Sequence, residues 1–315
     1  MAALKALVIR GSRNVFTLRP LDGFLPDVLE CRIKGKILKQ SGRFYNPLAP
    51  GDIVYAEDHG GGRGLILDAV ERRNFFVRFN QKGPQILGSN LDMVLCVTSL
   101  SSPPFRPRFI DRVLVQSEAA GIPALVLCNK CDLVSTEPVE DRLADYERIG
   151  YPVVRVSAKT GEGMEQLRRR LEGKTAILLG QSGVGKSSVI NALCPRLGLR
   201  TGALNEKYDR GNHTTTLSAL YDLEFSGGPG MPQTFLIDTP GLRHMVLWGI
   251  APEDLILYMK EFAPLDGRCL YGASCSHSGE SGCAVAAALE SRAIHKDRGE
   301  SYVRIREELP GRYDE

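Results

Sequence analysis

Nine consecutive residues, Gly180 to Ser188 with the sequence GQSGVGKSS, have the composition and spacing of a loop that binds phosphate. They satisfy the pattern G-x4-G-K-[S/T] and lie between a predicted strand at 175–180 and a predicted helix at 187–197. The glycines let backbone N–H groups turn toward phosphate oxygens, and the helix N-terminus adds a favourable dipole. We therefore predict a bound nucleotide, with Lys186 on its β- and γ-phosphates and Ser187 on Mg²⁺. The nucleotide-binding residues expected in this loop are Gly180, Gln181, Ser182, Gly183, Val184, Gly185, Lys186, Ser187 and Ser188.

The string NKCD, which follows an apolar strand at 123–128, predicts that the base of this nucleotide is guanine. The carboxylate of Asp132 can accept hydrogen bonds from N1 and N2 of guanine, a pattern that adenine does not supply. We expect Asn129 at the opposite edge of the base and the stem of Lys130 stacked on it. A companion loop, Ser157, Ala158 and Lys159, follows the next strand, where the backbone N–H of Ala158 would meet O6 of guanine.

Two further segments have residues suited to hydrolysis of the γ-phosphate. In DTPG, Asp238 would bind Mg²⁺ through water and the backbone N–H of Gly241 would sense the γ-phosphate. In GNHTTT (211–216), Thr215 is the expected Mg²⁺ ligand, with Thr214 as the alternative. Together they would order around the γ-phosphate and relax after its loss. The alternative for GNHTTT is a threonine-rich surface loop without a ligand.

A third set of residues, near the C-terminus, has the types and spacing of a metal site. Cys269, Cys275, His277 and Cys283 offer three thiolates and one imidazole within fifteen positions. Four such ligands fill a tetrahedral Zn²⁺ site and leave no open position, so we predict one structural zinc ion per chain. Iron is a less natural alternative for this ligand set, and an unliganded loop is the other.

The elements that must position these residues change in character along the chain of 315 residues. Short apolar segments punctuated by Gly, Pro and Asn up to about residue 80, the last at 75–79, predict a small antiparallel barrel. Strands and helices then alternate, as in a parallel α/β sheet, and after 247 the chain becomes helical and ends in a polar helix at about 285–309. We therefore expect a multidomain α/β protein with an N-terminal barrel at 1–80, a nucleotide-binding domain at 81–247 and a zinc-binding helical domain at 248–315.

The order of the nucleotide motifs is unusual. The guanine loop and its companion precede the phosphate loop, which is followed by the threonine loop and DTPG. This is a circular permutation of the usual order in GTP-binding domains. Because the segment after DTPG then leads directly to the C-terminal region, we expect the nucleotide state to be transmitted to whatever follows residue 247.

Charge and hydropathy suggest where the protein works and what it meets. Residues 1–80 carry 13 Lys and Arg against 8 Asp and Glu, although the whole chain has a net charge of only +3. This part is the expected polyanion-facing surface, with an ordinary solvated face as the alternative. The residues expected to contact RNA are basic ones beside aromatic ones, as in stacking surfaces, unless the aromatics belong to the barrel core: Arg32, Lys34, Lys36, Lys39, Arg43, Phe44 and Tyr45. No membrane-length apolar run or signal peptide is present, so we expect a cytoplasmic protein, and nothing in the pattern argues against a monomer.

The chain resembles the RsgA/YjeQ family, GTPases of bacteria that depend on the small ribosomal subunit. The resemblance covers nearly all residues and depends on NKCDL, SAKTGEG, GQSGVGKSS, GNHTTT, DTPGLR and the spacing C-x5-C-x-H-x5-C. It implies an OB-fold barrel, a circularly permuted P-loop GTPase domain and a zinc-binding C-terminal domain. It also implies binding to the small subunit and its ribosomal RNA late in maturation, with GTP hydrolysed to GDP when that subunit stimulates the enzyme.

The resemblance also bears on the catalytic residue. Leu242 occupies the position where Ras-like GTPases have the glutamine that orients the attacking water, so we expect slow hydrolysis by the isolated protein. By analogy with the family, His213 is the candidate to position that water; the alternative is that it only holds its loop. The function expected is a GTPase whose turnover licenses its own or another factor's release. The alternative is a switch that senses GDP or a guanine alarmone on the ribosome, with incidental turnover.

Overall fold

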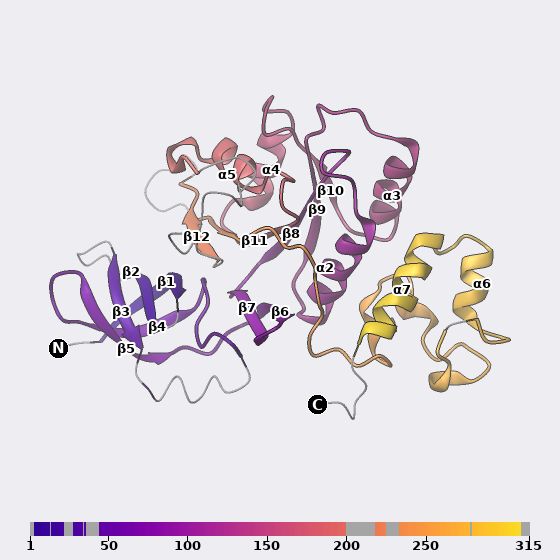
Figure 1. The fold of residues 1–315 in the computed structure, drawn as a ribbon, viewed down its shortest axis with the longest axis horizontal. Helices are drawn as coiled ribbons and strands as arrows, with labels where there is room; N and C mark the ends of the chain where they lie inside the picture. Colours follow the sequence, from indigo (N-terminus) through magenta and orange to yellow (C-terminus); the bar gives the residue numbers. More distant parts are fainter. Residues whose placement is uncertain are drawn as a thin grey trace.

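The computed structural model describes residues 3–12, 14–21, 28–33, 35, 44–199, 218–224, 233–277 and 279–309 (Figure 1). Three parts follow one another along the chain: an N-terminal barrel, a sheet flanked by helices, and a C-terminal region of short helices. The C-terminal region packs beside helices α2 (Pro107–Ala119) and α3 (Glu137–Arg148) and lies at the far end of the molecule from the barrel.

Five strands close the N-terminal barrel in the order β1-β2-β3-β5-β4. Their bounds are Leu4–Ser12, Val15–Pro20, Leu29–Ile33, Ile53–Asp58 and Arg63–Ala69, for β1 to β5 in turn. Buried and exposed residues alternate along β3, which places Leu29, Cys31 and Ile33 inside the barrel, as expected for a strand with one solvated face. This closed five-stranded barrel is consistent with the expected OB-fold.

The segment at 75–79 does not belong to the barrel, contrary to the expectation from sequence. It forms β6 (Phe75–Asn80), which pairs in a separate hairpin with β7 (Gly83–Ser89). The physical reason is packing, because Phe76 is fully buried in the hydrophobic cluster that surrounds α2 rather than in the barrel core. A short apolar strand has the same sequence pattern in a barrel and in a separate hairpin, so the sequence did not distinguish the two.

The central sheet has six strands in the order β10-β9-β8-β11-β13-β12. In chain order these are β8 (Met93–Ser99), β9 (Ala124–Asn129), β10 (Val153–Arg155), β11 (Thr175–Gly180), β12 (Ala219–Asp222) and β13 (Phe235–Asp238). All neighbours are parallel except β12 and β13. Strands β9 and β11 are buried on both faces, which explains their continuous apolar sequences.

Helices cover both faces of this sheet. The apolar residues of α2 and α3 share one hydrophobic cluster with one face, and those of α4 (Met164–Leu171) and α5 (Lys186–Leu193) share a second cluster with the other. A short 3-10 helix, Pro195–Leu197, follows α5. The carboxyl ends of the parallel strands therefore open on one edge between the two helical layers, which is where such sheets bind ligands.

The C-terminal region contains three 3-10 helices and two α-helices. The 3-10 helices span Leu255–Tyr258, Ala263–Leu265 and Gly272–Ser274, and the α-helices are α6 (Ala284–Glu290) and α7 (Lys296–Glu308). We expected one helix over 285–309. Instead the chain turns at 291–295, where Arg292 has a φ of +60° and Ile294 is buried.

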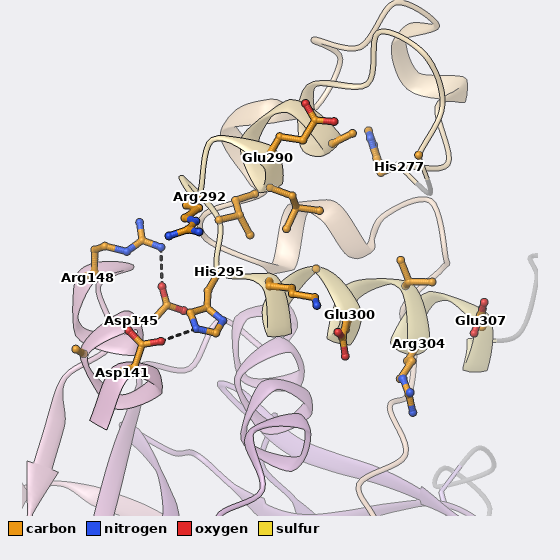
Figure 2. A pocket seen from close by; sticks show the side chains of 18 of the residues that line it. Asp141, Asp145, Arg148, His277, Glu290, Arg292, His295, Glu300, Arg304 and Glu307 are labelled. Carbon is orange, nitrogen blue, oxygen red and sulfur yellow. Dashed lines mark hydrogen bonds and ion pairs between the residues drawn. The ribbon is translucent and has the colours of Figure 1, made fainter. Parts of the chain in front are cut away.

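His295 fixes the start of α7 and joins it to α3. Its Nδ1 accepts a hydrogen bond from the backbone N–H of Asp297, and its Nε2 lies 2.8 Å from the carboxylate of Asp141 (Figure 2). Nearby, Arg148 and Asp145 of α3 are 2.6 Å apart.

Within the described ranges, none of the helices combines the length and the hydropathy needed to cross a membrane.

Candidate nucleotide site and metal centre

The loops that follow β9, β10, β11 and β13 meet at one edge of the sheet. The strands are adjacent or separated by a single neighbour, and they run in the same direction. The folded chain therefore brings together residues from Asn129 to Gly241 that the sequence analysis assigned to one nucleotide.

The phosphate loop and the DTPG segment that packs against it each need a glycine for steric reasons. Gly185 has a φ of +92°, and a Cβ added there would lie 2.3 Å from Nδ2 of Asn129. A Cβ on Gly241 would lie 2.9 Å from the backbone nitrogen of Ser182. The segment after β13 is therefore packed directly against the phosphate loop, as a segment that senses the γ-phosphate must be.

Lys186 lies buried under the phosphate loop. Its Nζ donates hydrogen bonds to the carbonyl oxygens of Gly180 (3.0 Å) and Gln181 (3.1 Å). Burial lowers the pKa of Lys186 to about 8, and the nearby carboxylate of Asp238 opposes that shift. A phosphate would supply the negative charge that this buried amine lacks.

Asp238 has the properties of a residue prepared for a cation. Its Oδ1 is buried and has no hydrogen-bond partner among the described residues. Burial raises the pKa of Asp238 to about 6, against the opposing effect of Lys186. An unpaired buried carboxylate oxygen is a hard donor that suits Mg²⁺, and Ser187, partly buried at the start of α5, is the hydroxyl expected beside it. These residues fit a magnesium ion that accompanies the phosphates.

The guanine loop is joined to both of its neighbours by Asn129. This buried side chain donates from Nδ2 to the carbonyl oxygen of Val184 (2.9 Å) and accepts at Oδ1 from the N–H of Ala158 (3.1 Å). The N–H that we expected to meet O6 of guanine is therefore bonded to protein here, and a base would have to share it. The second hydrogen on Nδ2 remains for the base edge, so both roles stay predictions.

Asp132 is exposed at the edge of the site, and its orientation is fixed. The hydroxyl of Ser157 donates to its Oδ1 at 2.6 Å. This hydrogen bond is the main cause that lowers the pKa of Asp132, and Lys159 and Lys130 act in the same direction. An ionised carboxylate with one oxygen held by Ser157 is suited to accept hydrogen bonds from N1 and N2 of guanine.

Lys130 connects three loops, which the sequence analysis did not predict. Its Nζ donates to the carbonyl oxygens of Gly183 (2.8 Å) and Ser102 (2.6 Å), the latter in the loop after β8. The residue has a φ of +64°, an uncommon conformation for a side chain of this size. The string SSPPF at 101–105 gives no local signal for this contact, because its partner is 28 residues away.

The segment after Gly241 is anchored at both ends. Leu242 is buried, and its N–H donates to the carbonyl oxygen of Gly180 at 3.1 Å, so its side chain fills the core instead of facing the phosphates. At the other end, the buried amide of Gln116 on α2 holds Trp248, accepting from its N–H (2.9 Å) and donating to its carbonyl (3.3 Å). Between them, the N–H of Phe79 donates to the carbonyl of Val246 (3.1 Å).

Several expected site residues lie outside the described residues. They are His213, Thr214 and Thr215 in the threonine loop, together with Lys34, Lys36, Lys39 and Arg43 of the basic stretch. Arg32 is exposed on β3, and Tyr45 is 46% exposed, with the Nζ of Lys82 5.2 Å from its ring centre. Phe44 packs against Phe75 and Trp248, with ring centres 5.5 and 5.2 Å apart, so it belongs to an aromatic cluster and not to a stacking surface.

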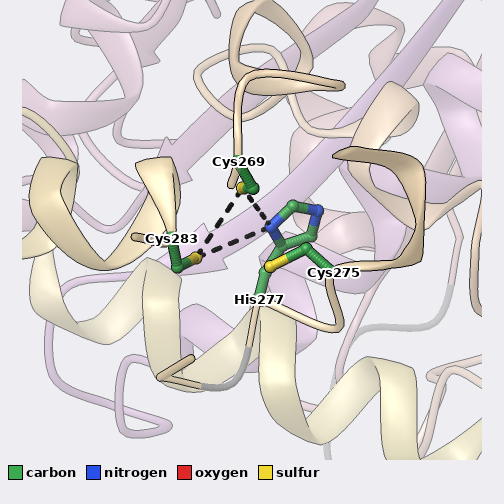
Figure 3. A group of neighbouring side chains, drawn as sticks. All are labelled: Cys269, Cys275, His277 and Cys283. Atoms are coloured by element: carbon green, nitrogen blue, oxygen red, sulfur yellow. Dashed lines mark hydrogen bonds between the residues drawn. The ribbon is translucent and has the colours of Figure 1, made fainter. Parts of the chain in front are cut away.

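The four predicted metal ligands converge in the C-terminal region (Figure 3). Their ligand atoms all lie within 4.8 Å of one another, and all four residues are buried. Sγ of Cys269 is 4.0 Å from Sγ of Cys283 and 3.3 Å from Nδ1 of His277. Tetrahedral zinc with ordinary bond lengths separates two sulfurs by roughly 3.8 Å and a sulfur from a nitrogen by roughly 3.6 Å. The cluster fits one zinc ion with a complete set of protein ligands.

Backbone groups around the cluster support this assignment. The N–H of Ala284 donates to Sγ of Cys269 (3.3 Å), and the N–H of Ala286 donates to Sγ of Cys283 (3.4 Å). Such hydrogen bonds stabilise thiolates rather than thiols. They come from the first turn of α6, so metal binding and the start of this helix are structurally linked.

Comparison with known proteins agrees with the nucleotide site. A model of the family described as RsgA GTPase matches residues 69–248. A protein named "Small ribosomal subunit biogenesis GTPase RsgA" in Flavobacterium johnsoniae is 36% identical over 309 residues, covering 95% of this chain and 92% of that protein. A protein of the same name in Gemmatimonas aurantiaca is 44% identical over 230 residues, or 73% of this chain and 72% of that one.

Solved structures are similar over almost the whole chain. YjeQ from Thermotoga maritima covers 99% of this chain and all of its own, with a TM-score of 0.75 and 29% sequence identity. YloQ, described as a circularly permuted GTPase, has a TM-score of 0.67 at 23% identity and covers 98% of this chain and 97% of its own, which supports the fold alone.

Proposed function

Because the chain belongs to the RsgA GTPase family, we propose that it hydrolyses GTP to GDP and phosphate on the small ribosomal subunit, late in the maturation of that subunit. Hydrolysis would license release of the protein itself or of another factor. Relatives that span nearly the whole chain are named for biogenesis of this subunit, which supports the choice of partner.

One structural observation supports GTP as the substrate most directly. The buried pair of Lys186 and Asp238, which suits phosphate and Mg²⁺, lies at the same sheet edge as Asp132, which suits guanine. The two chemistries are joined by Asn129 and Lys130, which bond the guanine loop to the phosphate loop. A site of this kind binds GTP as one ligand instead of a phosphate and a base separately.

The test is GTP hydrolysis by the purified protein alone, with isolated small subunits, and with large subunits as the matched control. We expect slow turnover alone and strong stimulation by small subunits only, because Leu242 leaves the site without the glutamine that orients water. Equal rates in all three samples, with GTP still bound, would contradict the proposal. In that case tight binding of GDP or an alarmone would favour a sensing switch.

We assign the remaining roles as part of this proposal. Thr215 would complete the Mg²⁺ site with Ser187, Gly241 would sense the γ-phosphate, and His213 would position the attacking water. Replacing His213→Ala should abolish stimulated turnover and spare GTP binding, measured by fluorescence of a labelled nucleotide. Turnover equal to that of the parent protein would dismiss the role of His213.

The proposed partner, the small ribosomal subunit, also implies where the protein works. A protein that binds maturing small subunits would work in the cytoplasm, and we propose that it acts there as a monomer. Sedimentation of the purified protein at micromolar concentration should give a mass near the 34.6 kDa of one chain.

A further inference from the structure

A cationic groove runs beside the nucleotide site, between the start of α2 and the exposed side of α7. Its volume is about 870 Å³. One wall is formed by residues 105–112, the other by α7, and the segment 243–246 closes one side. Gln181 of the phosphate loop also lines it, so the groove and the phosphate site share a boundary.

Arginines outnumber acidic residues in this groove. Five arginines line it, against Asp297, Glu300 and Glu308, and each of these acids already has an ion-pair partner. Arg108 pairs with Glu300 at 3.2 Å and Arg112 with Glu308 at 2.5 Å, which connects the two walls. The acidic charge is therefore neutralised, for Glu300 and Glu308 by arginines of the groove and for Asp297 by Arg142 of α3.

Of the other three arginines, two lie exposed on opposite walls of the groove. In the part of the chain that the structure describes, neither Arg106 nor Arg304 makes an ion pair or a side-chain hydrogen bond. Glu300 and Arg304 project from the side of α7 that faces away from His277 (Figure 2). Arg243 and His244, both exposed, add further basic groups on the segment that follows DTPG.

We propose that this groove binds the sugar-phosphate backbone of an RNA strand of the small ribosomal subunit, with Arg106 and Arg304 as phosphate contacts. The inference rests on the proposed function, which supplies the RNA. Guanidinium groups bind phosphate oxygens bidentately, and a groove of about 870 Å³ with arginines on opposite walls suits a chain of phosphates better than one small anion. Phe105, partly exposed beside Arg106, offers an apolar surface for an unpaired base.

The position of the groove gives RNA binding a consequence for hydrolysis. Its side formed by 243–246 continues directly from Gly241, which contacts the phosphate loop at Ser182. An RNA strand in the groove would thus touch the segment whose position depends on the γ-phosphate. Binding of RNA and of GTP would then be coupled, with each strengthening or weakening the other by the same factor.

The experiment measures how tightly the full-length protein, saturated with a non-hydrolysable GTP analogue, binds isolated small subunits at several salt concentrations. In the double variant Arg106→Gln, Arg304→Gln we expect affinity to fall by on the order of tenfold at about 0.1 M salt, and the slope of log affinity against log salt to fall by about 1 to 2. The variant Arg106→Lys, Arg304→Lys keeps both charges and should restore most of the slope. Nucleotide binding by each variant is measured first, as a check of folding.

The matched control is Arg170→Gln on α4, an exposed arginine on the other face of the sheet. An equal effect there would mean that only net charge matters, and it would overturn the groove assignment. Lower affinity with an unchanged salt slope would indicate a ribosomal protein as the occupant and would also overturn it. If the double variant behaves as the parent, the groove is not the contact, although the proposed function stands. If the parent itself does not bind small subunits, both fail.

Discussion

At the scale of single residues, the nucleotide site carries a stability cost that its ligands should relieve. Lys186 is buried, and Asp238 is half-buried with its Oδ1 buried. Burial raises the pKa of Asp238 to about 6 and lowers that of Lys186 to about 8, which favours the neutral form of each. The opposite charge of the neighbouring residue offsets only part of each pKa shift. A phosphate chain with Mg²⁺ would supply the missing charges, so the residues that weaken the empty protein are those proposed to bind the ligand.

Replacing Asp238→Asn should stabilise the nucleotide-free protein at pH 7 and remove Mg²⁺-dependent GTP binding. The folded-state pKa of Asp238, about 6, is above its ordinary value of 3.8, so its protonated form favours folding. That contribution is present below pH 3.8 and is lost as the pH rises through 6. The loss is on the order of 1–3 kcal/mol, and Lys186, left without its neighbour, reduces the gain in the variant.

Thermal unfolding without nucleotide between pH 4.5 and 7.5 measures this effect. The melting temperature of the parent should decline more steeply with pH than that of the Asp238→Asn variant. A variant that melts below the parent at pH 7 would show that pairing with Lys186 outweighs the burial of Asp238.

At the scale of elements, helix α2 connects the nucleotide domain to the C-terminal region. Its Asp111 has no exposed surface and accepts hydrogen bonds from Arg298 (2.8 Å) and Ser301 (2.5 Å) of α7 and from Tyr146 (2.7 Å) of α3. Burial alone would raise the pKa of Asp111, but Arg298 and Arg142 hold it below its ordinary value. Arg298, also fully buried, is further bonded to Glu261. Three elements are therefore joined at one carboxylate.

Replacing Asp111→Asn should destabilise the attachment of α7 by about 3 kcal/mol, because two arginines would lose a buried partner. Hydrogen exchange of the α7 amides, compared with those of α4, would locate the effect. The control is Glu165→Gln, which removes the exposed pair of Glu165 and Arg169 and should cost less than about 1 kcal/mol. Similar exchange in both variants would mean that the buried carboxylate does not hold the helix.

The amide of Gln116 makes α2 an anchor for the segment after DTPG as well. Replacing Gln116→Leu keeps the volume but leaves the N–H and carbonyl of Trp248 unpaired, at a cost of about 1–3 kcal/mol. We expect faster hydrogen exchange at residues 245–250, while β9 exchanges as in the parent. Unchanged exchange there would show that packing of Trp248, rather than the amide, fixes the segment.

At the scale of the whole molecule, the C-terminal region is held at two places, which touch where the ring of His277 packs 6.0 Å from that of Tyr302 on α7. The zinc cluster organises residues 269–286, and the network at Asp111 attaches α7 to α2 and α3. From the sequence we expected the nucleotide state to be transmitted to whatever follows residue 247. Trp248 is held by Gln116 of α2, and Asp111 of α2 binds Arg298 of α7, so α2 would offer a second route for such a signal besides the covalent one.

Removal of zinc should unfold one of these parts and spare the other. The purified protein should contain one zinc ion per chain, and Cys283→Ser should lose it, with fast hydrogen exchange over 269–290. GTP binding should persist, because its residues lie at the edge of the central sheet and contact none of the metal ligands. A variant without zinc that keeps exchange protection at α6 would contradict a structural role for the metal.

The sequence by itself determined which reaction class and which metal to expect. The predicted phosphate contacts use consecutive backbone groups, the guanine and DTPG strings each follow a strand, and the four predicted metal ligands lie within fifteen positions, so local sequence contains most of the information. Only the tertiary structure decided how these parts are connected. Lys130 with Ser102, Gln116 with Trp248 and Asp111 with Arg298 are contacts across 28, 132 and 187 positions. The position of β6 outside the barrel likewise depends on the hydrophobic cluster that buries Phe76. The break before α7 depends on the burial of Ile294 in the same cluster. Local propensity does not specify such partners, because the free energy that selects them comes from packing of residues distant in the chain.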